Sequence, residues 1–386
     1  MLAKIKYLTA GESHGKGLLG IIQGIPAGLE INEKFIANDL FRRQQGHGRG
    51  GRMKIEKDHA EIYTGIRHGR SIGAPIGLII PNKDFENWTE KMSTEPVDKQ
   101  IKKVTLPRPG HADLSGVQKY DFDDIRNILE RSSARETTMR VALASICRKL
   151  LKEVNIEVGS RVVQIHKVKD ETILSEYISP VSLNKKADKS PVRCLDKQVG
   201  KRMIDAIDKA KKEGDSVGGI FEVVASGLPY GLGSHTQWYT KLHARITESI
   251  MSVNAFKGVE IGMGFESAGH LGSAVHDEIG WDGEKYFRYS NNAGGIEGGM
   301  SNAQPILIRT VMKPIPTLIK PLRSVDIMSK EDKLAHKERT DSCSVPAASI
   351  VAEAMVCLVL ADALLEKFGG DTIDQLKAHI QASGRY

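Results

Sequence analysis

Three arginines surround the predicted start of one helix, and they are Arg131, Arg135 and Arg140. Ser133 and Glu136 have the spacing of a capping box, in which Ser133 is the N-cap and Glu136 reaches back to it. The apolar run that follows predicts a buried helix from about Ser133 to Glu153. A helix start already carries free N–H groups and partial positive charge, so arginines there are costly unless an anion binds. The stretch therefore predicts a floor for phosphate or carboxylate, with an ordinary capped helix and solvated arginines as the alternative.

Arginine and glycine alternate in a second basic stretch, residues 42–52. This stretch overlaps the end of a helix predicted over Glu33 to Gln45, for which Asn32 is the expected N-cap. Glycine lets the backbone approach a ligand closely, and arginine supplies forked donors for anions. The pattern is typical of an anion-binding loop, and it is equally typical of a disordered basic arm.

Two histidines lie in turns that would expose them. His14 lies in a glycine-rich turn between two predicted strands, and His111 lies in a tight Pro-Gly turn. Turns carried by a rigid scaffold commonly present reactive groups. A lone histidine is nevertheless more often structural, so neither position identifies a site by itself.

The remaining pattern predicts long core helices covered by sheets, because three long helical stretches are largely apolar. The last of them is predicted from Ala347 to Phe368, with Ser344 as its cap and Pro346 in its first turn. An arginine and a serine again precede an apolar helix there, which suggests two similar halves. Residues 158–199 are rich in lysine and are expected to form a surface excursion. Further strands are predicted at 4–9, 18–22, 62–65, 76–81 and 218–225, and further helices at 201–212 and 243–254.

Composition narrows the class of protein. The chain has 386 residues, a net charge of +7 and 5% aromatic residues. The charge suits an acidic partner, which is either nucleic acid or a small polyanion. Aromatic side chains are not interleaved with the basic ones, which argues against stacking on RNA bases. Neither a Rossmann nor a P-loop fingerprint is present.

The sequence also bears on compartment and metals. No stretch of eighteen uncharged apolar residues exists, so a membrane span is not expected, and the chain begins without the apolar run of a signal peptide. The four cysteines form no CxxC pair and are expected to be reduced thiols. We therefore expect a cytoplasmic protein with no metal site.

Several motifs together resemble the chorismate synthase family. They lie at residues 11–15, 108–113, 131–137, 254–260, 293–304, 313–314 and 339–342. Their order and spacing fit that family from residue 6 to about 367. The resemblance implies one large α+β domain over residues 1–386, with long core helices sandwiched between antiparallel sheets, and a homotetramer. It implies conversion of 5-enolpyruvylshikimate 3-phosphate to chorismate by 1,4-anti elimination of phosphate, dependent on reduced FMN (FMNH2) without net oxidation.

The resemblance also implies roles for individual residues. His14 matches the acid that protonates the leaving phosphate, His111 the histidine that protonates or stabilises reduced flavin, and Asp341 the carboxylate that takes the ring proton. The substrate clamp corresponds to Arg43, Arg49, Arg52, Arg135 and Arg140. Arg43 and Arg49 also match NADPH positions in members that reduce their own flavin, and other members depend on an external flavin reductase.

The flavin positions carry over in the same way. The residues that correspond to them are Arg131, Ser132, Ser133, Asn254, Ala255, Gly298, Lys313, Pro314, Ile315, Pro316, Thr317 and Arg339. The chain departs from the common pattern at Thr340, where many members have serine, and at Gln44 and Gln45, where many are richer in arginine.

Overall fold

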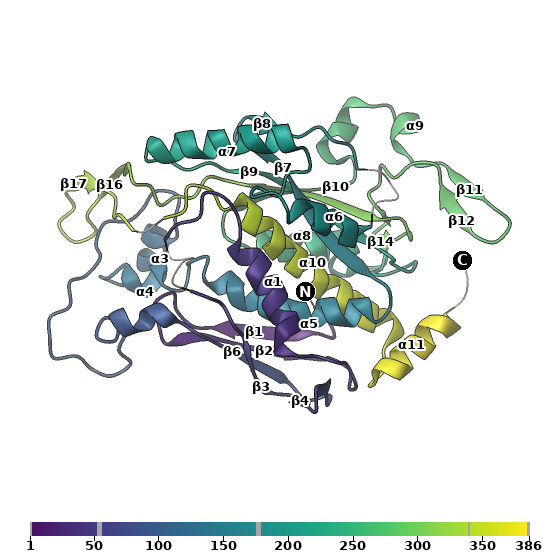
Figure 1. The fold of residues 1–386 in the computed structure, drawn as a ribbon, viewed down its shortest axis with the longest axis horizontal. Coiled ribbons are helices and arrows are strands. Elements are labelled where there is room, and N and C mark those ends of the chain that lie inside the picture. Colours follow the sequence, from purple (N-terminus) through teal and green to yellow (C-terminus); the bar gives the residue numbers. More distant parts are fainter. Residues whose placement is uncertain (1, 52–55, 175–178, 339, 384–386) are drawn as a thin grey trace.

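The computed structural model describes residues 2–51, 56–174, 179–338 and 340–383. Within them, two antiparallel sheets enclose a layer of helices (Figure 1). The first sheet has the order β1 (Lys6–Ala10), β2 (Gly17–Gln23), β6 (Ile76–Pro81) and β3 (Glu61–Thr64). The second has the order β10 (Phe256–Ile261), β15 (Ile306–Met312), β9 (Gly219–Ser226), β7 (Glu157–Ile165) and β8 (Val168–Lys169). The helices between them are α1 (Glu33–Gln44), α5 (Glu136–Lys152), α8 (Leu242–Met251) and α10 (Val345–Phe368). The predicted α+β sandwich is confirmed.

The two halves of the chain have the same topology. Each half runs strand, strand, helix, strand, strand, helix: β1, β2, α1, β3, β6, α5 in the first and β7, β9, α8, β10, β15, α10 in the second. In each sheet the four corresponding strands are arranged in the order first, second, fourth, third, and every pairing is antiparallel. The predicted similarity of the halves is confirmed. It places the starts of α5 and α10 at equivalent positions in adjacent helices.

Shorter elements surround this core. The helical ones are η1 (Lys83–Asn87), α3 (Asp113–Tyr120), α4 (Arg126–Leu129), α6 (Pro180–Ala187), α7 (Lys197–Lys212), η2 (Trp238–Thr240), η3 (Gly264–Gly269), α9 (Gly272–Val275) and α11 (Ile373–Ala382). Four two-stranded ribbons are formed by β4 (Ile66–Arg67) with β5 (Arg70–Ser71), β11 (Ile279–Trp281) with β12 (Tyr286–Arg288), β13 (Ile296–Glu297) with β14 (Met300–Ser301), and β16 (Arg323–Val325) with β17 (Asp332–Leu334) in the described residues.

Helix α10 is the central element of the core. It is apolar and long enough to cross a membrane, yet its most apolar stretch is entirely buried inside the protein. Two buried carboxylates on it tie distant segments together. Asp362 accepts hydrogen bonds from the backbone N–H groups of residues 3–5. Glu353 accepts from Arg42 on α1 at 2.9 Å, Arg148 on α5 at 2.8 Å and Ser160 on β7 at 2.6 Å.

We expect Glu353→Ala to destabilise the fold by about 3–5 kcal/mol, because it leaves buried arginines without their counter-charge. Burial alone would raise the pKa of Glu353, but Arg42, Arg148 and Arg193 hold it at about 2, below the usual 4.5. A depressed pKa means that this stabilisation is present above pH 4.5 and is lost as the pH falls toward 2. Urea unfolding at neutral pH measures the effect. Glu153→Ala is the control, since Glu153 pairs with Lys149 and Lys377 near the surface and should cost about 0–1 kcal/mol. Equal losses in the two variants would contradict the prediction.

The predicted capping box at the start of α5 is wrong. The helix begins at Glu136, and its N-cap, Arg135, makes no side-chain capping bond. The Ser133 hydroxyl accepts from the backbone N–H of Arg135 and donates to the hydroxyl of Ser13. Glu136 instead binds Thr9 of β1 and Arg140. Tertiary partners from the first sheet therefore replace the local reciprocal bonds.

Two other local predictions have different outcomes. Asn32 caps α1 by accepting from the backbone N–H of Phe35, as predicted. Ser344 is the residue before α10, but its hydroxyl donates to Asp341 and makes no capping bond, so its predicted capping role is wrong.

The segment 158–199, predicted to be a surface excursion, begins with a buried strand. Strand β7 lies inside the second sheet, between β9 and β8, and most of its residues are buried. The lysines that suggested an excursion are exposed on α6 and the segment after it, at Lys185, Lys186 and Lys189. The exposed lysines lie on the outer face of α6 and just after it, whereas the apolar strand β7 belongs to the core.

Candidate active site

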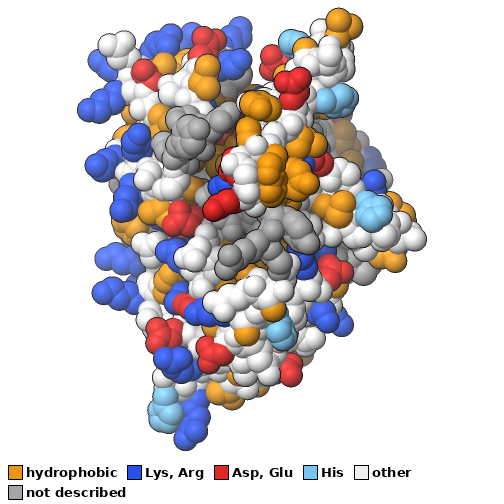
Figure 2. Space-filling model, turned by 90° about the vertical axis from the view of Figure 1, so that its right-hand side faces the viewer, with side chains coloured by type: hydrophobic (Ala, Val, Ile, Leu, Met, Phe, Trp, Pro, Cys, Tyr) orange, Lys and Arg blue, Asp and Glu red, His pale blue; other side chains and the backbone are white. Residues whose placement is uncertain are grey.

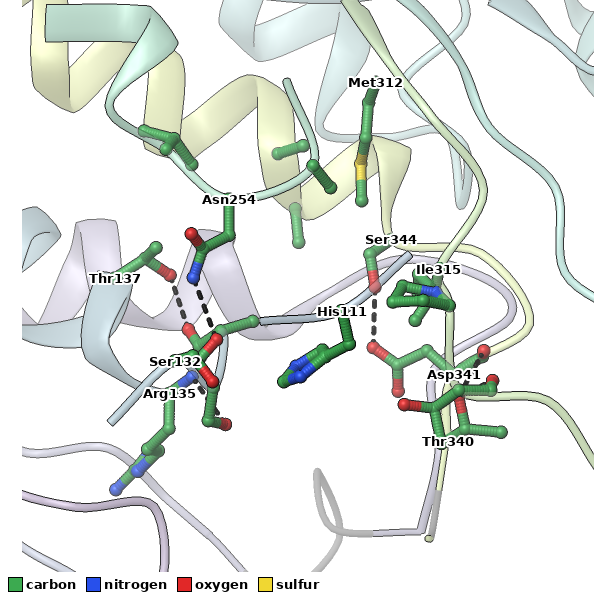
Figure 3. Close-up of a pocket in the computed structure, with 18 of the residues that line it drawn as sticks. His111, Ser132, Arg135, Thr137, Asn254, Met312, Ile315, Thr340, Asp341 and Ser344 are labelled. Atoms are coloured by element: carbon green, nitrogen blue, oxygen red, sulfur yellow. Dashed lines mark hydrogen bonds between the residues drawn. The ribbon is translucent and has the colours of Figure 1, made fainter. Parts of the chain in front are cut away.

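Turns from both halves meet at a cavity of about 410 Å³ beside the starts of α5 and α10. His14, His111 and Asp341 all open onto it, although they come from the β1–β2 turn, the turn before α3 and the turn before α10. Figure 3 shows His111 between Ser132 on one wall and Asp341 on the other. The remaining predicted residues that line this cavity are Arg43, Arg49, Ser132, Ser133, Arg135, Asn254, Ala255, Lys313, Ile315, Pro316 and Thr317.

Four other predicted residues that the structure describes do not line the cavity. Arg131, which precedes α5, binds the backbone of Thr9 and Gly11. Arg140, one turn into α5, binds Glu136 and Ser252. Gly298 lies in the β13–β14 turn, and Pro314 is not among the lining residues. Arg52 and Arg339 lie outside the described residues.

His14 is held by a buried carboxylate. Its Nδ1 lies 3.0 Å from both oxygens of Glu130, and its backbone N–H donates to the same carboxylate at 2.8 Å. Arg126 donates to Glu130 at 2.8 Å. Burial opposes ionisation of Glu130, but the bonds from His14 and Arg126 hold its pKa below the usual range. The carboxylate is therefore ionised near neutral pH.

His111 has a matching arrangement. Its Nδ1 lies 2.5 Å from Asp113, whose other oxygen accepts from Nε of Arg108 at 2.8 Å. Arg108 also donates to Thr317 at 2.9 Å, which connects this turn to the segment after β15. Burial opposes ionisation of Asp113, but the bonds from His111 and Arg108 hold its pKa well below the usual range. Each histidine thus contacts an ionised carboxylate, and that carboxylate also accepts a hydrogen bond from an arginine.

Asp341 is bound by the loop that follows α1. Its carboxylate pairs with Arg49 at 2.9 Å and accepts from the backbone N–H of Gly50 at 2.6 Å. It also accepts from the Ser344 hydroxyl at 2.7 Å. The Arg-Gly stretch, as far as the structure describes it, is therefore an ordered wall of the cavity, which favours the predicted ligand loop over a disordered arm.

Two buried arginines each have a guanidinium nitrogen whose N–H groups make no hydrogen bond within the described residues. These nitrogens are Nη1 of Arg43 and Nη2 of Arg135, and both are buried. Asp58 contacts both side chains, bonding Arg135 directly and lying 3.7 Å from Arg43. Burial lowers the pKa of Arg43 to about 10, with Arg49 and Arg135 adding to this effect and Asp58 opposing it. An anion in the cavity would satisfy these donors and relieve their mutual repulsion.

Several residues that shape the site were not among those predicted for it: Asp58, Trp88, Arg108, Asp113, Arg126 and Glu130. Asp113 could have been found, since it lies two residues from His111 and its carboxylate can reach that ring. Trp88 and Asp58 carry no local signal, because they reach the site through contacts with residues far away in the sequence.

The fold and the cavity define an α+β enzyme whose site brings two histidines and a carboxylate together with buried arginines. A family model described as Chorismate synthase matches residues 5–365. Chorismate synthase of Geobacillus thermodenitrificans (strain NG80-2) is 53% identical over 386 residues, covering 99% of each chain. Chorismate synthase of Bacillus subtilis (strain 168) is 53% identical over 383 residues, covering 98% of each chain.

A solved structure agrees with these relatives. A crystal structure of chorismate synthase superposes with a TM-score of 0.80 at 42% identity, covering 99% of this chain and 98% of that chain. The chain belongs to the chorismate synthase family. It is a lyase that carries out the chorismate synthase step of the shikimate pathway, in a family that uses reduced FMN.

Proposed function

We propose that the cavity binds 5-enolpyruvylshikimate 3-phosphate and, with reduced FMN, converts it to chorismate by 1,4-anti elimination of phosphate. The observation that carries this proposal is the convergence of His14, His111 and Asp341 on a cavity with unsatisfied buried arginine donors. A substrate with one phosphate and two carboxylates needs such donors, and forked guanidinium groups suit them.

The cavity walls fit a flavin as well as the substrate. Hydroxyl and amide groups of Ser132, Ser133 and Asn254 line one side, and the side chains of Met312, Ile315 and Pro316 offer an apolar surface for a flat ring. We infer that these groups hold FMN, together with Ala255, Lys313 and Thr317. When bound, reduced FMN supplies electron density to the reacting ring and undergoes no net oxidation.

His14 and Asp341 divide the proton chemistry between them. The C–O bond to phosphate breaks with its electron pair on oxygen, and His14 delivers a proton to that oxygen from Nε2. Asp341 takes the ring proton from the C–H bond. The electron pair of that bond forms a new ring double bond, and the pair of the existing double bond moves to the carbon that loses phosphate, as a 1,4-elimination requires. The two groups belong to turns on different elements, so the substrate can lie between them.

The experiment that tests the proposal is an anaerobic assay of chorismate formation with chemically reduced FMN. We expect turnover under these conditions and none with oxidised FMN. A parallel assay with NADPH under air shows whether this chain reduces its own flavin or depends on an external flavin reductase. Absence of turnover with reduced FMN would overturn the proposal.

We expect Arg49→Ala mainly to raise the KM for the substrate, by about 10- to 100-fold, because a charge-assisted hydrogen bond to an anion is lost. The change in kcat should be smaller, since Arg49 contacts Asp341 but does not itself move a proton. Steady-state kinetics under anaerobic conditions measure both. Arg70→Ala is the control, because Arg70 is exposed and pairs with Glu30 away from the cavity. An unchanged KM in Arg49→Ala would place the substrate clamp elsewhere.

We further propose that the protein is a cytoplasmic homotetramer. The outer face of the first sheet exposes Leu8, Leu19 and Ile21, whereas the second sheet carries the charged pairs of Arg309 with Glu222 and Glu260. Hydrophobic side chains also gather on the face that carries the β11–β12 ribbon (Figure 2). Apolar patches of this kind are typical of protein interfaces. Sedimentation of the native protein at the mass of four chains is the expected result.

A further inference from the structure

The ring of His14 is held from two directions. In its plane, Nδ1 contacts both oxygens of Glu130 at 3.0 Å. On its face, the indole of Trp88 stacks with a centroid separation of 4.0 Å and an interplanar angle of 25°. Glu130 follows α4 and Trp88 follows η1, so two elements distant in sequence converge on one imidazole.

We infer that Glu130 and Trp88 are positioning residues for His14. Glu130 selects the tautomer of the imidazole, and Trp88 fixes the orientation of the ring plane. This inference rests on the acid role of His14 proposed above. Neither residue is placed against the substrate by this inference; both act through the imidazole.

Glu130 selects the tautomer because an ionised carboxylate accepts hydrogen bonds and cannot donate them. Nδ1 of His14 must then carry a proton in both the neutral and the charged ring. The proton that the ring exchanges is therefore the one on Nε2, which makes no hydrogen bond within the described residues. In the opposite tautomer the ring would present a bare Nδ1 to the carboxylate, and lone pairs would face each other.

Trp88 restricts rotation of the His14 imidazole about its Cβ–Cγ bond. Rotation of the imidazole about its Cβ–Cγ bond would break the bond from Nδ1 and also the stacking contact. A single arginine connects the two restraints, because Arg126 donates to Glu130 and its guanidinium carbon lies 4.9 Å from the centre of the Trp88 ring. The His14 turn, α4 and the segment 83–92 are thereby linked as one unit.

This arrangement differs from simple burial of a histidine. A structural histidine needs one satisfied nitrogen and apolar surroundings. Here one nitrogen and one ring face are held, while the ring lines the cavity. Replacement of either restraint should consequently alter the orientation and tautomer of His14 more than it alters the fold.

The first test replaces Glu130 with glutamine in the full-length protein. We expect Glu130→Gln to reduce kcat by about 10- to 100-fold, the range found where the group behind a metal-bound histidine is removed. The KM for the substrate and the affinity for FMN should stay within about twofold. Magic-angle-spinning NMR of ¹⁵N-histidine-labelled protein reads the tautomer, with the His14 signal assigned by its loss in His14→Ala. We expect Nδ1–H alone in the wild type and a mixture of tautomers in Glu130→Gln, because an amide can either accept or donate.

The control for this variant is Glu222→Gln, which also removes a carboxylate bound by arginines but lies on the second sheet. It should leave kcat and the His14 signals unchanged. A wild-type kcat together with an unchanged tautomer in Glu130→Gln would overturn the role of Glu130.

The second test concerns Trp88 and is independent of whether Glu130→Gln folds. We expect Trp88→Ala to lower kcat by about tenfold at unchanged KM, and Trp88→Phe to restore most of it, since phenylalanine keeps a stacking ring. Lys91→Ala is the matched control, because Lys91 lies 5.0 Å from the same indole centre and makes no hydrogen bond or ring contact with His14 within the described part of the chain. Equal rates in Trp88→Ala and Lys91→Ala would overturn the role of Trp88.

The NMR measurement separates this inference from the proposed function, because it needs neither flavin nor turnover. If His14→Ala retains full activity while Glu130→Gln still redistributes the tautomers, the catalytic assignment of His14 fails and the positioning contact stands. If His14→Ala loses activity while the tautomer is the same in both proteins, the positioning role of Glu130 fails and the acid assignment stands.

Discussion

His14→Ala should reduce kcat for chorismate formation by about 10²–10⁴-fold, the contribution typical of a positioned general acid. The substitution removes Nε2, so solvent must protonate the leaving phosphate. Binding of FMN should be unaffected, because the predicted flavin wall is formed by other residues. Anaerobic turnover with chemically reduced FMN and a spectral titration of FMN binding measure the two quantities.

A second substitution at position 14 separates the loss of the proton donor from the loss of the contact with Glu130. His14→Asn retains an N–H donor for Glu130 but has no group that titrates near neutral pH. It should lose as much kcat as His14→Ala does. His59→Ala is the control, since His59 is an exposed histidine that pairs with Glu33 at 2.9 Å. Turnover close to that of the wild type in either His14 variant would contradict the acid assignment.

The core elements could be predicted from the sequence because their signals are local. Apolar periodicity placed α5 and α10 close to their observed ends, and the side chain of Asn32 marked the start of α1. The arginine and serine ahead of both α5 and α10 correctly indicated two similar halves, since these helix starts occupy equivalent places in the shared topology.

Predictions failed where a tertiary partner competes with a local one. Ser133 has the spacing of a capping residue, but its hydroxyl donates to Ser13 of the β1–β2 turn. Ser344 likewise precedes a helix, and its hydroxyl binds Asp341. The two serines that the sequence predicts as helix caps therefore bind residues of neighbouring turns, and both line the cavity between the two halves.

The partners of the predicted site residues could not be predicted for a related reason. Spacing identifies a turn that presents His14, but it does not say which carboxylate lies behind the ring. Glu130 is more than a hundred residues further along the chain, and Trp88, at the end of the short helix η1, is more than seventy residues away from His14. The motif thus indicates the chemistry, while the orientation of each group depends on long-range packing.

Asp341 is bound by Arg49, Gly50 and Ser344, and a kinetic comparison can separate this structural role from a role in proton transfer. The carboxylate serves as an anchor for the Arg-Gly loop and, in the proposed mechanism, as the base that takes the ring proton. Substitution of Asp341 removes both roles at once. Arg49→Ala breaks the ion pair while leaving the carboxylate in place, so its loss of kcat reports on the anchoring role, whereas its rise in KM reports on the lost contact with the substrate.

Asp341→Asn should reduce kcat by about 10²–10⁴-fold, because an amide cannot accept the ring proton. Its KM should also rise, since the ion pair with Arg49 is lost. With substrate deuterated at the carbon that loses its proton, the isotope effect on kcat should be larger in Asp341→Asn than in the wild type, as C–H cleavage becomes the slow step. A wild-type kcat in Asp341→Asn would remove Asp341 from the proton transfer. A loss of kcat in Arg49→Ala as large as that in Asp341→Asn would instead assign the effect to the loop, because the only change common to both variants is the broken ion pair.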